Sequence, residues 1–576
     1  MVMKIYASKG NIRNNKDIKR PNVYSFKGRD FISPDDITKE ELEYLVETGI
    51  RVKRDWNDPS KKEEQVNRLK GKRAMVMFLE PSSRTRESSI TATLAQGGDF
   101  REFPAIEANS FVKGEPWRDA FEVMGRGHGF DYFVLRTKVE GAPKHAAQVL
   151  RRLCEKKDKI YTPVINGGDG RHWHPTQGVL DHQFAYTIFC PDGNWDGLHN
   201  KSIAYAGDLT NSRTVHTSMR NWMRYKGVEF FFVAVEGMRM PKDYLSMLDV
   251  EGIKYKEVDS FSKKLVSNLD LIYLARPQQE RWQTGLTASQ RVEYAKAMTL
   301  LRSYFPDKPS RSLCGRFFLP IINHALPRDK KFQELEEALI DTPFWGAFDQ
   351  VEEGVYHRAG LFDLLLGVPG FGDELRKKRI QKTTEARITF ESEEADPKQR
   401  KGDQVGPINN GFVLDHIADD YELVLNIKQL IPAPRAGMSS GRVVSPSLCK
   451  AEDVGYKWII KIEDPSLGEV GDMHLVQMGT PALNRELAER LVMLDPEMVI
   501  NIIKNGRVRY KVRASFPNYV KGRIPCSNDA CISHPSQMEN VTSVFKVEDK
   551  KTRRYRCDYC DTIVDLRSVG FYSKGI

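Results

Sequence analysis

Short apolar runs separated by helical stretches recur along the chain as far as about residue 367. The first run, RAMVMFL, covers residues 73–79, and later runs read YFVLR, TPVINGG, KSIAYAGD, VEFFFVAV and LDLIYLARP. Each run is long enough for one buried strand, and helical segments lie between the runs. This alternation predicts an α/β fold with parallel sheets, in which function is expected at the carboxyl ends of the strands.

The extent of this pattern favours two parallel-sheet α/β domains side by side. We expect the first at residues 1–175 and the second at residues 176–349. A closing helix is expected at residues 350–368, where the chain returns to the first domain. Because a chain of 576 residues is too long for one hydrophobic core, further domains are expected beyond this helix.

The pattern changes after the closing helix. Residues 370–404 are charged and poor in large apolar groups, which is typical of a linker. Residues 405–518 contain a second set of apolar runs and one helical stretch, which predict an α+β, ferredoxin-like domain. The tail, residues 519–576, carries four of the eight cysteines and is expected to form a small domain resembling a zinc ribbon.

The composition is that of an ordinary soluble globular chain, with 40% hydrophobic and 29% charged residues. No run of about 18 or more apolar residues is present, and the N-terminal segment lacks the apolar core of a secretory signal. We therefore expect a cytoplasmic protein without a membrane partner. The net charge of +10 is compatible with an anionic partner, either nucleic acid or a small phosphorylated substrate, and net charge alone does not separate these.

The stretch FLEPSSRTRES, residues 78–88, joins an apolar run to a helical segment. The first N–H groups of a helix are unpaired and lie at the positive end of its dipole, which makes this junction suitable for an anion. The junction adds hydroxyl donors and guanidinium groups suited to phosphate, namely Ser82, Ser83, Arg84, Thr85 and Arg86. A solvated basic turn is the alternative, but this density of donors favours a phosphate pocket.

Other expected strand ends carry compatible side chains. NGGDGRHWHPTQ, residues 166–177, contains three glycines that would permit close approach to a ligand, followed by His174 and Gln177. Further strand ends carry the polar residues Arg136, Arg213, Arg276 and Gln278. A single arginine at such a place is usually a surface residue, but arginines at four strand ends predict substrates with several negative charges. Without paired carboxylates, a serine elbow or a metal motif, this half is suited to positioning and oxyanion stabilisation.

The cysteines of the tail follow a paired spacing, with Cys526 and Cys531 in one pair and Cys557 and Cys560 in the other. Two close pairs at this separation indicate a structural site for Zn²⁺ with four thiolate ligands, and incidental free thiols are the alternative. A zinc ribbon on a basic protein also suggests nucleic-acid binding as an alternative function. The residues between the pairs mix both signs of charge and offer no stacking platform, so we do not expect nucleic acid as a partner.

Taken in order, SSRTR, HPTQ, GDLTNSRTVH, RPQQER and HALPR resemble aspartate carbamoyltransferase over residues 25–370. The resemblance implies that the amine of L-aspartate attacks the carbonyl carbon of carbamoyl phosphate, giving N-carbamoyl-L-aspartate and phosphate, in pyrimidine biosynthesis. It also implies that the first domain binds carbamoyl phosphate, that the second binds aspartate, and that no organic cofactor is needed.

The resemblance further implies a role for each matched residue. The phosphate would be bound by Ser82, Ser83, Arg84 and Thr85. The carbonyl oxygen would be surrounded by Thr85, Arg136 and His174, and the carbamoyl amino group held by Gln177. Aspartate would be bound by Arg213, Arg276 and Gln278. Leu326 would offer backbone contacts near the reacting centre, and Glu80 would position arginines in the closed state. Ser110 and Lys113, in NSFVKGE, would enter the site from a neighbouring subunit of a homo-oligomer.

A carbamoyltransferase for another amino acceptor is the alternative within enzymes. Related ornithine carbamoyltransferases carry cysteine in the stretches that correspond to HALPR and HPTQ, and this chain does not. Arg276 would also repel the cationic side chain of ornithine. Ala325 stands where proline is usual, a change that would loosen the HALPR loop.

The C-terminal third resembles the regulatory chain of the same enzyme over residues 405–570, through GFVLDHI, IIKIE, CSNDACISH and CDYC. That chain is usually separate, so here it would be fused to the catalytic chain. The resemblance implies nucleotide effectors (ATP, CTP or UTP) bound by Asp415, His416, Lys457, Lys461 and Lys511. It also implies that the zinc domain joins catalytic trimers. The rival from another class is a non-catalytic zinc-containing scaffold that senses nucleotides or binds nucleic acid, which the arginines at the strand ends disfavour.

Overall fold

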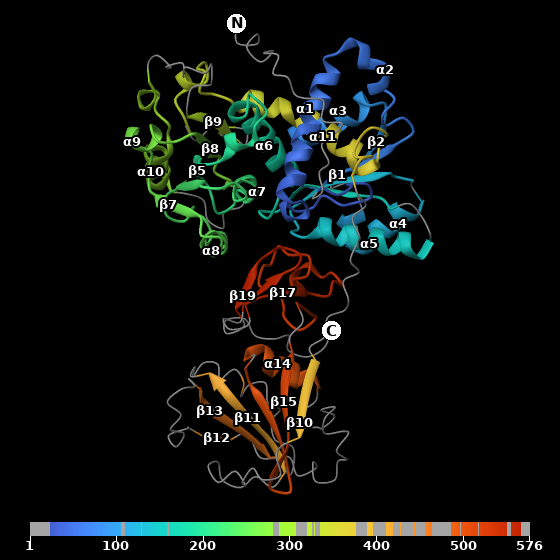
Figure 1. Cartoon of the computed structure of the whole chain (residues 1–576), viewed down its shortest axis with the longest axis vertical. Helices are drawn as coiled ribbons and strands as arrows, with labels where there is room; N and C mark the ends of the chain where they lie inside the picture. The colour runs from blue at the N-terminus through green and yellow to red at the C-terminus, as the bar shows by residue number, and fades with distance from the viewer. Residues whose placement is uncertain are drawn as a thin grey trace. The chain divides into compact units, whose positions relative to one another are not determined.

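The computed structural model divides the chain into two compact units, Met1–Ile380 and Gln381–Ile576, which are described separately (Figure 1). The structure describes residues 23–104, 110–127, 129–157, 161–279, 287–306, 320–324, 328, 334–375, 389–394, 410–418, 427, 442–444, 456–463, 485–495, 497–515, 518–549 and 554–565. Among these residues, no helix has the length and apolar character needed to cross a membrane.

The first unit begins with a four-stranded parallel sheet in the order β2-β1-β3-β4. Its strands are β1 (Arg73–Phe78), β2 (Asp99–Glu102), β3 (Tyr132–Thr137) and β4 (Val164–Asp169). Helices cover both of its faces: α1 (Lys39–Trp56), α3 (Ser83–Ala95) and α11 (Ala347–Leu366) lie on one side, and α4 (Trp117–Gly127) and α5 (Ala142–Lys157) on the other (Figure 1). A short helix, α2 (Lys62–Gln65), lies between α1 and β1.

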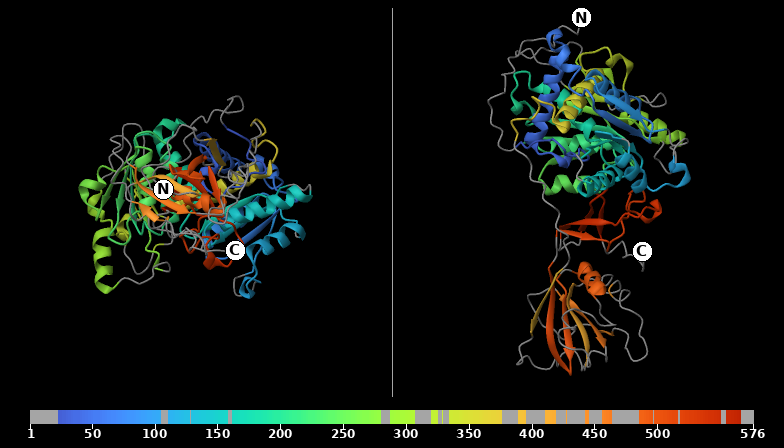
Figure 2. Two further views of the ribbon diagram at one scale, coloured as in Figure 1. Left: turned by 90° about the horizontal axis from the view of Figure 1, so that it is seen from below. Right: turned by 90° about the vertical axis from the view of Figure 1, so that its right-hand side faces the viewer.

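A second parallel sheet of five strands, in the order β7-β6-β5-β8-β9, completes the first unit (Figure 2). Its strands are β5 (Ser202–Gly207), β6 (Glu229–Val233), β7 (Lys254–Val258), β8 (Leu271–Ala275) and β9 (Ile321–His324). The accompanying helices are α6 (Pro175–Phe189), α7 (Arg213–Trp222), α8 (Lys242–Val250), α9 (Lys263–Val266) and α10 (Ala288–Met298). The central strands β5 and β8 are buried along nearly their whole length, as expected for a sheet covered by helices.

Helix α11 ties the first unit together. It packs against α1 and α3, which flank the first sheet, and against α6, which leads towards the second. Its residues are mostly buried, and it ends at Gly367, whose left-handed conformation (φ 65°) is the usual conformation at a helix end. One helix thus places side chains beside elements from both halves of the unit.

The second unit contains a six-stranded antiparallel sheet in the order β10-β15-β14-β11-β13-β12. Its strands are β10 (Thr389–Glu394), β11 (Gly411–Ala418), β12 (Arg442–Val444), β13 (Tyr456–Glu463), β14 (Val499–Lys504) and β15 (Arg507–Ser515), accompanied by helix α14 (Arg485–Leu494). Strand β10 lies inside the stretch 370–404 that the sequence indicates as a linker. It is the edge strand of the sheet, and backbone pairing with its neighbour β15 stabilises it, which requires no long apolar run.

The cysteine-bearing tail forms a small antiparallel sheet of four strands in the order β16-β17-β18-β19. Its strands are β16 (Tyr519–Lys521), β17 (Val544–Asp549), β18 (Arg554–Cys557) and β19 (Ile563–Asp565). Two contacts join this sheet region to α14 within the same unit. The Tyr555 hydroxyl donates to the carbonyl oxygen of Met493 at 2.9 Å, and Arg523 pairs with Glu489 at 2.7 Å.

Candidate active site

The N-terminus of α3 presents the hydroxyl and guanidinium groups predicted to hold phosphate. Ser82 is the N-cap residue, yet its side chain makes no capping hydrogen bond, so it does not occupy the first N–H groups of the helix. Thr85 is buried, and Arg84 is half-buried. Burial, together with the positive charge of Arg276, lowers the pKa of the Arg84 guanidinium. A bound anion would offset this unfavourable environment of the Arg84 guanidinium.

Arg86 does not belong to this pocket, although the sequence suggests it. Its guanidinium pairs with Glu102, which accepts from Arg86 Nη2 at 2.6 Å, and with Glu87. The reason is helical geometry: successive residues of an α-helix are about 100° apart, so residues two apart point to nearly opposite sides. Arg84 and Arg86 thus face different surroundings.

His174 lies at the centre of the site as the N-cap residue of α6. Its Nε2 is 3.2 Å from Thr85 Oγ1, and its Nδ1 is 3.3 Å from Thr176 Oγ1. Its backbone N–H donates to Thr217 Oγ1 at 2.9 Å, which fixes the start of the helix. Burial, with added repulsion from Arg136 and other cationic groups, holds the pKa of His174 well below its usual value. The ring is therefore neutral at physiological pH.

Glu80 joins two of the predicted substrate-binding arginines. Its Oε2 accepts from Arg213 Nη1 at 2.8 Å and lies 3.7 Å from Arg136 Nε. Arg213 also donates to the carbonyl oxygen of Gly170, and Arg136 to that of Gly167. Arg213 is thus buried and occupied by Glu80, so binding a substrate carboxylate through this guanidinium requires Glu80 to share or release it.

The glycines of NGGDG make room for these arginines. Gly168 has a φ of +119°, and a Cβ atom there would lie 2.9 Å from Arg213 Cζ and 3.3 Å from Arg136 Nη1. The close approach that the sequence predicts is therefore present, but its partners in this structure are protein guanidinium groups rather than a ligand.

Hydrogen bonds to neighbouring residues hold the two glutamines of the predicted site, Gln177 and Gln278. Gln177 Nε2 donates to Asp181 Oδ1 at 2.9 Å. Burial raises the pKa of Asp181 to about 7. Gln278 donates through its Nε2 to the carbonyl oxygen of Asn211 at 2.9 Å, and its backbone N–H donates to Asp208 Oδ2 at 3.1 Å.

Of the expected positions Ser110, Lys113 and Leu326, only Lys113 has a side chain among the described residues. Lys113 is exposed at the end of a short 3-10 helix, Ser110–Lys113. The side chain of Ser110, and Leu326 as a whole, lie outside the described residues.

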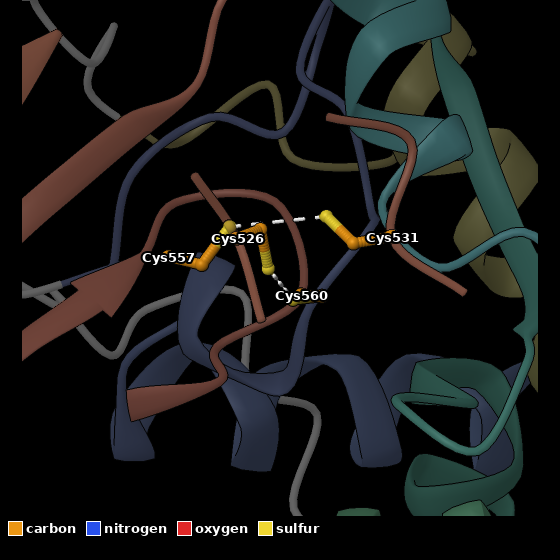
Figure 3. Close-up of side chains that lie close together, drawn as sticks. All are labelled: Cys526, Cys531, Cys557 and Cys560. Carbon is orange, nitrogen blue, oxygen red and sulfur yellow. Dashed lines mark hydrogen bonds between the residues drawn. The ribbon is translucent and has the colours of Figure 1, made fainter. Parts of the chain in front are cut away.

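The four C-terminal cysteines converge as their spacing predicts (Figure 3). All four Sγ atoms are buried and lie within 4.8 Å of one another, with 3.5 Å between Cys526 and Cys560 and 3.9 Å between Cys531 and Cys557. Four sulfur atoms bound tetrahedrally to zinc at about 2.3 Å are about 3.8 Å apart, so this cluster fits that ion.

Comparison with known proteins identifies these regions. Residues 29–187 match the carbamoyl-phosphate-binding domain of aspartate/ornithine carbamoyltransferases. Residues 403–515 and 518–569 match the allosteric and metal-binding domains of the aspartate carbamoyltransferase regulatory chain. The aspartate carbamoyltransferase catalytic subunit of Aliivibrio fischeri is 33% identical over 58% of this chain and 96% of its own length.

The chain belongs to the aspartate carbamoyltransferase family.

Further comparisons agree. A protein of Treponema denticola named PyrBI is 28% identical over 94% of this chain and 98% of its own length, so the fused arrangement also occurs elsewhere. The structure of aspartate transcarbamoylase from Trypanosoma cruzi, in complex with carbamoyl aspartate and phosphate, superposes with a TM-score of 0.50 at 26% identity, covering 60% of this chain and 98% of that one. The predicted family, fold class and C-terminal metal-binding domain are confirmed.

The predicted effector residues lie on neighbouring strands of the regulatory sheet. Asp415 and His416 belong to β11, and Lys457 and Lys461 to the adjacent β13, where Lys461 pairs in register with Val413. The side chains of these four residues lie outside the described part of the chain. Lys511 is half-buried in β15, between Asn501 of β14 and Glu393 of β10 in the register of the strands.

Several residues around the site are missed by reasoning from the sequence. Asp208 and Asn211 stand inside the motif GDLTNSR, where buried acidic and amide groups at a strand end could have indicated the loop contact with Gln278. Thr176 and Arg358, which contact each other next to His174, carry no such signal because 182 positions separate them.

Proposed function

We propose that this chain transfers the carbamoyl group of carbamoyl phosphate to the amine of L-aspartate, with its C-terminal part as a nucleotide-responsive regulatory chain. The observation that supports this most is the 3.2 Å contact between Thr85 and the buried His174, on which Arg136 and Arg213 act with their positive charges. Hydrogen-bond donors and positive charge gathered at one place suit a substrate that is anionic and develops an oxyanion.

The phosphate group would occupy the N-terminus of α3. Arg84 would provide a charge-assisted contact, the hydroxyl of Ser82 would donate to a phosphate oxygen, and Thr85 would donate through its backbone N–H in the first turn of the helix. Ser83 would contribute through its backbone N–H as the first residue of the helix.

The carbonyl group would lie beside Thr85, Arg136 and His174. As the amine nitrogen attacks the carbonyl carbon, the C–N bond forms and the carbonyl oxygen becomes an oxyanion that accepts hydrogen bonds from these three residues. The tetrahedral intermediate then collapses, the bond between the carbon and the phosphate oxygen breaks, and the amine proton leaves with phosphate. Because the neutral His174 ring serves as a donor, phosphate is the better proton acceptor.

Selection of aspartate would depend on the second sheet. Arg213 and Arg276 would each bind one carboxylate, with Gln278 in support, while Gln177 would hold the carbamoyl amino group. Glu80 already links Arg213 and Arg136, so aspartate binding would redistribute the arginines around this carboxylate.

The assembly and its regulation extend this proposal. Ser110 and Lys113 would enter the site of a neighbouring subunit, backbone atoms of Leu326 would contact the substrate, and the chain would act as a cytoplasmic homo-oligomer. ATP, CTP or UTP would bind near Asp415, His416, Lys457, Lys461 and Lys511. The domain boundaries 1–175, 176–349, 370–404, 405–518 and 519–576, with the closing helix at 350–368, stay part of the proposal.

A direct assay tests this function. Carbamoyl phosphate is incubated with L-aspartate or, separately, L-ornithine, each with and without ATP, CTP and UTP, and both products are quantified. We expect carbamoylation of aspartate at a rate that shifts with nucleotide, and none of ornithine. Carbamoylation of ornithine alone would overturn the acceptor assignment, and turnover insensitive to every nucleotide would overturn the regulatory part. No turnover with either acceptor, combined with salt-dependent binding to nucleic acid, would favour the scaffold alternative.

A further inference from the structure

Helix α11 carries a buried arginine, Arg358, that contacts Thr176, a direct neighbour of His174 in the site. Arg358 is 2% exposed and donates through Nη1 to the carbonyl oxygen of Gly354 at 2.8 Å and through Nη2 to Thr176 Oγ1 at 3.2 Å. In the part of the chain that the structure describes, no acidic group acts on it as an ion-pair partner. A buried guanidinium without a carboxylate is costly, so its position requires another explanation than a salt bridge.

The direction of the hydrogen bonds follows from the chemistry of the groups. An arginine donates only, so Thr176 Oγ1 accepts from Arg358. Within the described residues, the second partner of this oxygen is His174 Nδ1, at 3.3 Å. Thr176 is 1% exposed, so its hydroxyl proton needs a protein acceptor, and Nδ1 is the one within reach. His174 Nδ1 therefore accepts, and the ring proton is on Nε2.

The tautomer determines what the opposite nitrogen of the His174 ring, Nε2, presents to the site. His174 Nε2 lies 3.2 Å from Thr85 Oγ1, so the Nε2–H group donates towards Thr85 and the place where the carbonyl oxygen would lie. With the opposite tautomer, Nε2 would present a lone pair there and repel an oxyanion.

We propose that Arg358 and Thr176 are positioning residues that fix His174 as the Nε2–H tautomer, so that its ring donates a hydrogen bond to the reacting carbonyl oxygen. This inference deepens the proposed function and rests on it for the identity of that oxygen. Neither residue touches the substrate in this account, because Thr176 acts through His174 and Arg358 acts through Thr176.

The charges around the ring support the same state. Burial is the main cause of the lowered pKa of His174, and repulsion from Arg136 on β3, Arg213 on α7, and Arg358 and His357 on α11 adds to it. A second proton on the ring is thus disfavoured from three elements, and Thr176 decides which nitrogen carries the single proton. Burial lowers the pKa of Arg358 itself to about 10, so its guanidinium stays charged at physiological pH.

The contacts from Arg358 through Thr176 to His174 form a hydrogen-bond relay. The test interrupts this relay one residue at a time and reads the tautomer of His174 directly. The full-length protein is labelled with ¹⁵N-histidine, and the His174 signals are assigned by comparison with a His174→Asn variant. In the unsubstituted protein we expect a neutral ring with a protonated Nε2. Thr176→Val removes the donor to Nδ1, so we expect a mixture of tautomers or a charged ring, and a kcat about 10-fold or more lower with a smaller change in KM.

Matched variants separate this role from simple packing. Thr176→Ser keeps the hydroxyl and should keep both the spectrum and kcat. Arg224→Gln serves as the control for Arg358→Gln, because Arg224 is half-buried and also donates to backbone carbonyls, of Pro34 and Ile37, away from His174. We expect Arg358→Gln, but not Arg224→Gln, to alter the His174 signals.

Two results would overturn the inference: a folded Thr176→Val protein with unchanged His174 signals, or a Thr176→Ser protein that behaves like Thr176→Val. The spectra need no substrate, so they test the relay even if carbamoyl transfer to aspartate is absent. In that case the relay would stand and the proposed function would fail.

Discussion

The site around His174 and the cysteine cluster place reactive side chains in opposite ways. The residues around His174 come from the loop after β1 and from α3, β3, α6, α7 and α11, spread along the chain from Glu80 to Arg358. The four cysteines lie close in sequence, between Cys526 and Cys560, in a domain with short strands. At the first site, protein hydrogen bonds orient the groups. At the second, four sulfur atoms approach one another in a domain that offers little core to hold them there.

The difference concerns what each site needs to keep its shape. His174 and Thr85 are oriented by buried neighbours with no ligand involved. Thiolates brought within 4.8 Å repel one another unless a cation lies between them. The catalytic unit should therefore keep its arrangement without substrate, whereas the cysteine domain should depend on its metal.

Removal of zinc should produce the largest effect. A structural zinc site of this kind contributes roughly 10–16 kcal/mol of binding free energy, which is coupled to folding. We expect a chelator, or the substitution Cys531→Ser, to unfold the domain of β16 to β19 and to reduce the oligomeric mass. Zinc content, limited proteolysis and light scattering measure these changes.

Cys154→Ser is the control, because Cys154 is a half-buried cysteine of the catalytic unit, far in sequence from the cluster. It should leave zinc content and mass unchanged. If zinc is lost while the proteolysis pattern and the mass stay the same, the cluster is not what holds the domain or the assembly together.

The two sites also differ in how far the sequence predicts them. Cys526, Cys531, Cys557 and Cys560 are predicted together because spacing along a short segment limits how they can converge. Arg84 and Arg86 look equivalent in the sequence, and only the helix that begins at Ser83 separates the pocket from the pair with Glu102. The contact of Arg358 with Thr176 depends on how α11 packs on α6, which local periodicity does not encode.

The fold shows the same limit. The parallel sheets follow from apolar runs, since burial on both faces leaves a continuous hydrophobic signal. Strand β10 is missed because its pairing with β15 is made by the backbone, and residues 389–394 carry the charge typical of a linker.

The buried carboxyl group of Asp181 should give the next largest effect, because its burial lowers the stability of the protein at neutral pH. Burial raises the pKa of Asp181 from 3.8 to about 7, so the native state binds this proton more tightly than the unfolded chain does. Stability is then present at low pH and is lost as pH rises from about 4 to about 7, by on the order of 4 kcal/mol. Asp181→Asn should remove this loss. Urea unfolding at pH 5 and pH 8 should show that the free energy of unfolding of the variant, relative to that of the unsubstituted protein, is higher at pH 8 than at pH 5.

Asp192→Asn, at an exposed position shortly after α6, is the matched control. It should change the free energy of unfolding by the same amount at both pH values. A constant difference between the Asp181→Asn variant and the unsubstituted protein across this range would mean that Asp181 is ionised in the native state. The hydrogen bond from Gln177 would then be charge-assisted.

The smallest of the three effects compares two arginines on one helix. Arg84→Ala should lower kcat/KM for carbamoyl phosphate by about 10²–10³-fold, because it removes a charged donor where negative charge develops, and should leave thermal stability nearly unchanged. Arg86→Ala removes the same side chain from the same turn, but there it breaks only exposed pairs with Glu87 and Glu102, so kcat/KM should change little. Steady-state kinetics on both variants decide between them. Equal losses would mean that the phosphate is bound by the general charge of this turn. A loss confined to Arg84→Ala would mean that the helix, by turning one guanidinium inward and the other outward, defines the pocket.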